Sequence, residues 1–225
     1  MINNYIMILK NIDKTENIIN EIITKVTSRV EAKADKVVWP LNAEYVAPTQ
    51  SVAVSKVGVA VDALVKYLNN GGIPADAIEY GSVSAYPQEE WVNGSSTGRI
   101  TSYRASRAVT VRTDDVNLVL KLSTNLGSLL ETGINVSNYG PQYYLSTLNK
   151  IRPQLLSEAT KDAKSRAEAM TKAVGGKVGS ITSVKAGPIQ VTTPDSTATA
   201  DYGMYDTSSI KKTVTATVTV SFKTN

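Results

Sequence analysis

Two overlapping Ser-x-x-Lys spacings are the clearest chemical pattern in this sequence. Ser208 precedes Lys211 by three residues, and Ser209 precedes Lys212 in the same way. On a helix, residues at this spacing are neighbours, so a lysine can assist a serine nucleophile. Here the segment leads into a strand-like stretch, and residues three apart on a strand point to opposite faces. A Ser/Lys hydrolase is therefore kept only as an alternative hypothesis.

Histidine and cysteine are both absent from the 225 residues. Their absence removes Ser-His-Asp and Cys-His catalysis, imidazole or thiolate zinc sites, and disulfides. Asp114 and Asp115 form a carboxylate pair, but adjacent helical residues diverge by about 100°. The pair is therefore predicted to stabilise a helix start. We assign no catalytic residue, metal site or cofactor.

The charged residues give a small basic excess, with 24 Lys and Arg against 20 Asp and Glu. The arginines of 99–112 divide between two strand faces, Arg99 and Arg107 against Arg104 and Arg112. A phosphate-tracking stripe would keep them on one face. No nucleic-acid partner is therefore predicted, and weak nucleic-acid or anion binding is a further alternative. No run approaches the roughly 20 apolar residues of a transmembrane span, and no signal peptide is readable.

The first part of the chain contains two amphipathic segments. In residues 13–26 four isoleucines make one apolar face, which predicts a short helix, although a strand fits as well. Residues 31–46 are predicted to form a strand that is an edge strand or bulged at Pro40, because proline cannot donate to a ladder. Trp39 is predicted to be a core residue.

The clearest helix is predicted over residues 50–70. Its apolar face comprises Val54, Val57, Val61, Leu64 and Leu68, and Gly71-Gly72 ends it with a left-handed cap. A strand follows at 77–86. Residues 87–99, which contain Asn93-Gly94, are predicted to form a loop, and 99–112 the next strand.

A second helix is predicted over residues 113–133, with Val119, Leu122, Leu126 and Leu129 as its seam, and a short strand over 134–140. The order so far is strand, helix, strand, strand, helix, strand. This split βαβ order is typical of ferredoxin-like domains. We therefore expect an α+β fold in which the helices pack on one face of an antiparallel sheet.

An alanine-rich helix is predicted next, with Pro153 in its first turn and Gly175-Gly176 after its end. Its seam of mostly small residues comprises Leu156, Ala159, Ala163, Ala167, Met170 and Val174. Small side chains let a helix backbone approach its neighbour closely. The charges between the seam residues are therefore predicted to face water.

The remaining chain is predicted to contain two strands, at 177–185 and 210–223, separated by an exposed polar loop at 193–209. Strict alternation in the last strand puts Val214, Ala216, Val218, Val220 and Phe222 on a buried face and threonines on the other. The predicted organisation is an N-terminal extension, 1–24, and a domain, 25–223. The βαββαβ part covers about 25–140, and the helix with two strands about 150–223.

An ordered set of four segments carries a family resemblance. They are "VEAKADKVVWPL" (30–41), "YRASRAVTVRTDDVNLV" (103–119), "YGPQYYLSTLNKIRPQLLSEATKDAKSRAEAM" (139–170) and "GGKVGSI" (175–181). In this order they resemble the SIMPL-domain family, also called DUF541, and most closely its subgroup with an ADxxxWP first strand. The resemblance spans roughly residues 25–223.

The resemblance implies an α+β domain of the bacterial periplasm or cell envelope, in a family with members that form rings and with proposed roles in stress tolerance. It implies no catalytic residues. This sequence departs from the family pattern at Val26, where a glycine is usual.

The residues and the resemblance together predict a non-enzymatic envelope domain that self-associates or binds a protein partner. Tyrosine and tryptophan are enriched at protein interfaces. The predicted contact residues are therefore Tyr86, Trp91, Tyr202 and Tyr205.

Overall fold

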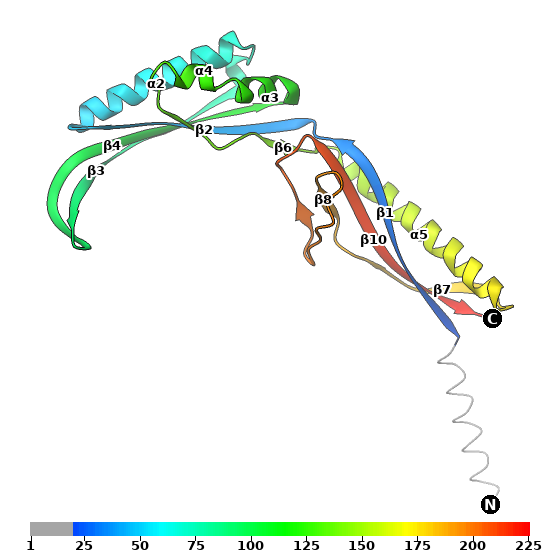
Figure 1. Ribbon diagram of the computed structural model, residues 1–225. Coiled ribbons are helices and arrows are strands. Elements are labelled where there is room, and N and C mark those ends of the chain that lie inside the picture. The colour runs from blue at the N-terminus through cyan, green and yellow to red at the C-terminus, as the bar shows by residue number, and fades with distance from the viewer. Residues whose placement is uncertain (1–19) are drawn as a thin grey trace, which may run out of the picture. The chain divides into compact units, whose positions relative to one another are not determined.

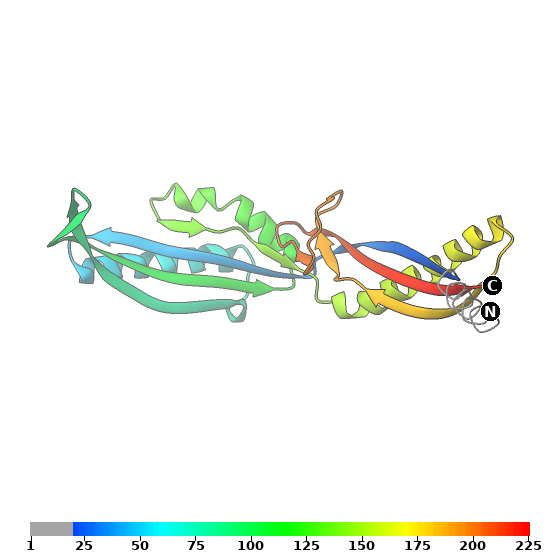
Figure 2. The same ribbon diagram turned by 90° about the horizontal axis from the view of Figure 1, so that it is seen from below.

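The computed structural model describes residues 20–225, which form two compact units (Figures 1 and 2). The central unit contains Lys33–Ser146 and Thr207–Ile210. The terminal unit contains the described part of Met1–Ala32, together with Thr147–Asp206 and Lys211–Asn225. Each unit is built on a five-stranded, mostly antiparallel sheet. The predicted α+β fold class is confirmed.

The central unit has the predicted split βαβ arrangement. Its strands are β2 (Lys36–Ala47), β3 (Ile78–Val92), β4 (Ser95–Thr113), β5 (Val136–Asn138) and β6 (Gln142–Tyr144). Its helices are α2 (Gln50–Asn70), the short 3-10 helix η1 (Ala75–Ala77), α3 (Val116–Thr124) and α4 (Gly127–Leu130). The antiparallel strand order is β3-β4-β2-β5, and β6 also pairs with β2. Figure 1 shows α2, α3 and α4 on one face of this sheet.

Helix α2 has the predicted bounds and very nearly the predicted face. Val57, Val61, Leu64 and Leu68 are buried, and Val54 is half-buried against the same core. The positive φ of Gly72, 103°, provides the left-handed ending. Trp39 of β2 is fully buried. Its Nε1 donates a hydrogen bond to Asn138 at 2.8 Å, as a core tryptophan requires.

The second predicted helix is divided into α3 and α4 at Asn125-Leu126. All four predicted seam residues are buried. Asp115 caps α3 by accepting from the amide of Leu118 at 2.9 Å, which confirms its predicted role at the helix start. Asp114 lies outside the helix and pairs with Lys36.

The predicted loop at 87–99 is wrong, because β3 continues to Val92 and β4 begins at Ser95. Asn93 and Gly94 both have positive φ, 50° and 82°. Two such residues make the tight turn that joins twisted antiparallel strands. The polar sequence around them forms a long hairpin.

The prediction that β2 is an edge strand or bulged at Pro40 is also wrong. One side of β2 pairs with β4 without a register shift, and the other pairs with β6 at 36–38 and with β5 at 41–43. The amide of Glu44 donates to Asn135 on the β5 side, so Pro40, four residues earlier, faces the same side. Pro40 sits where neither short strand pairs, and its missing donor costs no ladder bond.

The terminal unit pairs one long helix with a sheet of distant segments. Its strands are β1 (Glu21–Lys33), β7 (Val178–Ala186), β8 (Gln190–Thr192), β9 (Met204–Tyr205) and β10 (Lys211–Thr224), and its helix is α5 (Leu148–Ala173). The order is β1-β10-β8-β9, and β7 also pairs with β10. Figure 2 shows β1 (blue), β10 (red) and β7 (gold) as neighbouring strands.

The predicted helix at 13–26 is wrong for residues 21–26, which belong to β1, and residues 13–19 lie outside the described part of the chain. The isoleucine spacing fits both the helical and the strand period. Pairing with β10 makes this segment a strand. The prediction for β10 is confirmed, since its five apolar residues are all buried. The 193–209 segment is mostly loop, as predicted, but contains β9, and Met204 is only half-exposed.

The alanines of α5 let this helix lie directly on the sheet. Ala159, Ala163 and Ala167 have no exposed surface, and they pack on Val26, Val218, Val220 and Phe222. The approach is close enough for the hydroxyl of Thr24 to donate to the carbonyl of Ala163 at 3.2 Å. Charges between the alanines face solvent, where Arg166 pairs with Asp162 and Lys164 with Glu168.

Both ends of the predicted α5 seam need correction. The helix begins at Leu148, five residues before Pro153, which therefore lies inside it. Met170 and Val174 are exposed, and the buried positions near the two ends are Leu155 and Thr171. Thr171 satisfies its hydroxyl by donating to the carbonyl of Ala167 at 2.9 Å, as a buried polar side chain must.

Lys212, the second residue of β10, is fully buried. Its ammonium donates to the backbone carbonyl of Asp206 at 2.5 Å and lies 3.5 Å from the Asp206 carboxylate. Burial lowers the pKa of Lys212, and the attraction of Asp206 only partly opposes this effect. The unfolded chain thus binds this proton more tightly than the folded chain does.

We predict that Ala163→Leu destabilises the protein by roughly 1–3 kcal/mol, because a larger side chain holds α5 away from β1 and β10. Ala169→Leu, at an exposed position of the same helix, should change stability by less than about 0.5 kcal/mol. Urea unfolding of both variants measures the difference. Equal effects at the two positions would contradict close packing along the alanines.

For Lys212 we predict a pH-dependent stability difference. The penalty of burying its charge fades as the pH rises from the lowered pKa toward the unfolded value of about 10.4. The free energy of unfolding of the wild type, minus that of Lys212→Met, should therefore increase between about pH 7 and about pH 10. Urea titrations across this range test the sign. Lys223→Met, at an exposed position of β10, controls for the loss of one positive charge, and a flat or falling difference for Lys212→Met would refute the assignment.

Candidate functional site

Residues 88–102 form the outer part of the β3–β4 hairpin, here called the hairpin arm. The last β2 residue that pairs with β4 is Ala47, opposite Tyr103, so no third strand from residues 20–225 pairs with the arm (Figure 1). Its two strands pair with each other, with register shifts around Glu89. Two-stranded ribbons of this kind are marginally stable in water without additional contacts.

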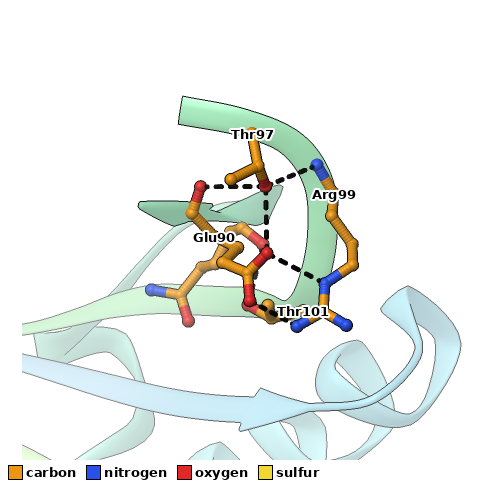
Figure 3. A network of polar contacts seen from close by, with 5 residues as sticks. Glu90, Thr97, Arg99 and Thr101 are labelled. Carbon is orange, nitrogen blue, oxygen red and sulfur yellow. Dashed lines mark hydrogen bonds and ion pairs between the residues drawn. The ribbon is translucent and has the colours of Figure 1, made fainter. Parts of the chain in front are cut away.

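One face of the hairpin arm is tied together by its own polar side chains (Figure 3). The Glu90 carboxylate accepts from Nε of Arg99 and from the hydroxyl of Thr97, both at 3.1 Å. Thr101 donates to the carbonyl of Gln88 at 3.1 Å. These contacts hold the two strands together across the turn.

The hairpin arm also exposes several large apolar side chains. Trp91 is 69% exposed, while Val92 and Ile100 are about half-exposed. Trp91 lies opposite Ser96, and Ile100 lies opposite Glu89. Tyr86, at the base of the arm, is half-exposed and lies opposite Arg104, whose guanidinium bonds the Glu44 carboxylate at 2.6 Å. Two of the predicted contact residues, Tyr86 and Trp91, therefore belong to one exposed strand.

The other two predicted residues, Tyr202 and Tyr205, belong to the terminal unit. They line a cavity of about 510 Å³, here called the tyrosine cavity, between the start of α5, the 186–189 turn and β9. Its other lining side chains include Leu148, Arg152 and Leu156. Tyr202 is fully exposed, whereas Tyr205 is 40% exposed. The four predicted contact residues therefore belong to two different surfaces, one in each unit.

A second cavity of the terminal unit was missed by the sequence predictions. It has a volume of about 480 Å³ and lies on the sheet face opposite α5, and we call it the threonine cavity. Lys25 and Arg29 of β1, Lys185 of β7, and three threonines of β10 line it. The alternation of β10 predicts a threonine face, but Lys25 lies in the segment 13–26, for which a helix was predicted, and Arg29 lies just beyond it.

The Ser-x-x-Lys spacings do not lie on a helix. Ser208 and Ser209 precede β10, which begins at Lys211, as the alternation had indicated. The ammonium of Lys212 is engaged with Asp206. The helical geometry that makes this spacing chemically useful is therefore absent from 208–212.

Within residues 20–225, no helix is both long and apolar enough to cross a bilayer. No group of three or more carboxylate side chains is arranged to hold a metal ion there.

Several solved structures resemble this chain distantly. The designed protein Foldit4 is 10% identical, covering 49% of this chain and 98% of that chain, with a TM-score of 0.24. A putative amidohydrolase/peptidase from Burkholderia cenocepacia is 14% identical over 54% of this chain, with a TM-score of 0.25. A hydrolase from Listeria innocua is 8% identical, covering 85% of this chain and 91% of that chain, with a TM-score of 0.21. Likenesses at these TM-scores carry no argument about activity.

This chain covers 31% of the Burkholderia cenocepacia chain and between 29% and 35% of similar amidase chains. No curated protein matches the sequence. The family model described as "SIMPL: Protein of unknown function (DUF541)" matches residues 22–222, which include nearly all of both units. The chain therefore belongs to the SIMPL (DUF541) family.

Proposed function

We propose that this protein is a non-enzymatic domain that associates with a second copy of itself, or with a protein partner, through the hairpin arm. The observation that carries this proposal is the exposure of Trp91 on a two-stranded ribbon that extends beyond its last pairing with β2. A large aromatic side chain on a protruding surface provides contact area at low entropic cost.

The backbone of the hairpin arm supports the same proposal. β3 is an edge strand, and β4 loses its neighbour β2 beyond Tyr103. The arm therefore has two edges along which further strands can pair. A second arm placed along either edge would extend the ribbon and bring apolar side chains such as Trp91 and Ile100 out of water.

A non-enzymatic role is proposed because the chain lacks histidine and cysteine, and because 208–212 lacks the geometry of a Ser/Lys pair. Turnover of a generic ester or peptide substrate that disappears in Ser208→Ala or Ser209→Ala would contradict this part.

Action in the periplasm or cell envelope, with a role in stress tolerance, is proposed from the family resemblance alone. Fractionation that recovers the protein only from the cytosol of its source cells would contradict the location.

We predict that sedimentation equilibrium detects species heavier than the 24.1 kDa chain as concentration rises. Trp91→Thr should weaken this association at least about tenfold, equivalent to about 1.4 kcal/mol, because it removes the largest exposed apolar surface of the arm. Threonine preserves strand propensity.

The matched control is Val59→Thr, which removes an exposed apolar side chain from α2. It should leave association unchanged. A chain that remains monomeric at its highest soluble concentration would rule out self-association, and equal weakening by both variants would rule out a specific role for the arm.

A further inference from the structure

We propose that the threonine cavity binds a small anion that also carries hydroxyl groups, of the class of sugar phosphates and sugar acids. This site is separate from the hairpin arm, because its residues all belong to the terminal unit.

Strand alternation gathers the polar groups of this cavity. Lys25, Thr27 and Arg29 alternate along β1, and Thr215, Thr217 and Thr219 alternate along β10. The hydroxyls of Thr27 and Thr217 are 3.0 Å apart, so the two sets share a face. Lys185 of β7 lies opposite Thr219. Helix α5 covers the apolar face, which leaves this face open to a ligand.

The charges of the cavity indicate an anion. Lys25, Arg29 and Lys185 line it, against the single carboxylate of Asp201. Within residues 20–225, no ion pair involves any of these three cations. By contrast, four of the other arginines, at 99, 104, 112 and 166, each pair with a carboxylate. Unneutralised like charges around one hollow favour the entry of a negative group.

A buried acceptor indicates that the ligand also donates hydrogen bonds. Gln190 lines the cavity and is only 8% exposed. Its Nε2 donates to the carbonyl of Ala200 at 2.8 Å. Its Oε1 has no partner among the described residues and almost no exposed surface, so a ligand reaches this oxygen after a rotation of the side-chain amide. Buried acceptors are nearly always satisfied. A carboxylate supplies no donor at neutral pH and a phosphate monoester supplies almost none, whereas a sugar hydroxyl does.

The volume and the lining fit the same class of ligand. Small-molecule sites usually span about 300–1,000 Å³, and this cavity has about 480 Å³. Threonine hydroxyls both donate and accept, so Thr215 and Thr219 can pair with sugar hydroxyls of either orientation. Ala200 and Asp201 close one side through the bond from Gln190, which ties their loop to β8.

Calorimetry on the full chain at low salt tests the site with glucose 6-phosphate and glucuronate. At least one should bind with a Kd below about 1 mM, and which one binds separates phosphate from carboxylate recognition. Glucose and inorganic phosphate should each bind at least about tenfold more weakly, because glucose carries no charge and inorganic phosphate carries no sugar hydroxyls. In NMR spectra, the side-chain amide of Gln190 should shift more with the bound sugar than with inorganic phosphate.

The double variant Lys25→Gln/Arg29→Gln should weaken binding at least about tenfold. Both positions are exposed strand positions, so the fold should persist, and circular dichroism checks this. The matched control is Lys66→Gln/Lys121→Gln, which removes two exposed charges from the central unit. It should leave the affinity unchanged, as should Trp91→Thr.

Several results would overturn the proposal. They are the absence of binding by either sugar at concentrations on the order of 10 mM, equal affinity for inorganic phosphate, and an affinity that the double variant does not change. Binding of a DNA oligonucleotide without binding of either sugar would also overturn it, because the site would then recognise a polymer backbone.

Discussion

The close packing of α5 on β1 and β10 is the constraint on which the terminal unit depends. Ala159, Ala163 and Ala167 are fully buried, and the hydroxyl of Thr24 reaches the carbonyl of Ala163 at 3.2 Å. This contact requires small side chains at successive helical turns, and it fixes which sheet face is covered. The other face, with its threonines and cations, is left free for a ligand. The covered face and the free face both follow from the alternation of apolar and polar residues along the strands, because each strand must present its apolar residues to α5.

In the central unit, the different lengths of the strands determine which surface is left exposed. The covering helices and the two-sided pairing of β2 produce an ordinary core around Trp39. β3 and β4 continue beyond Ala47 without β2, and their polar face is bound internally through Glu90, Thr97 and Arg99. The hairpin arm therefore keeps its shape partly by its own contacts while exposing Trp91. Rigidity with exposed aromatic surface favours a binding role, since less entropy is lost on association.

Sequence patterns predicted the helices and strands whose hydrophobic spacing is clear. They failed where the residue types suit more than one local structure. The face of α2, the alternation of β10 and the central alanines of α5 follow from spacing alone. The turn residues Asn93-Gly94 were recognised, but the polar strands beside them looked like a loop because both faces are exposed. Pro153 is typical of a first helical turn, but α5 starts five residues earlier, at Leu148. Lys25 and Arg29 are far from β7 and β8 in sequence, so only the folded sheet reveals the threonine cavity.

This protein is proposed to act through the exposed hairpin arm. Hydrogen exchange, measured by mass spectrometry at low and high protein concentration, tests it most directly. Amides in residues 88–102 should become more protected at high concentration, while those around Ala163 should be protected equally at both, because α5 is covered within each chain. Exchange in 88–102 that does not change with concentration, together with new protection elsewhere, would contradict the claim.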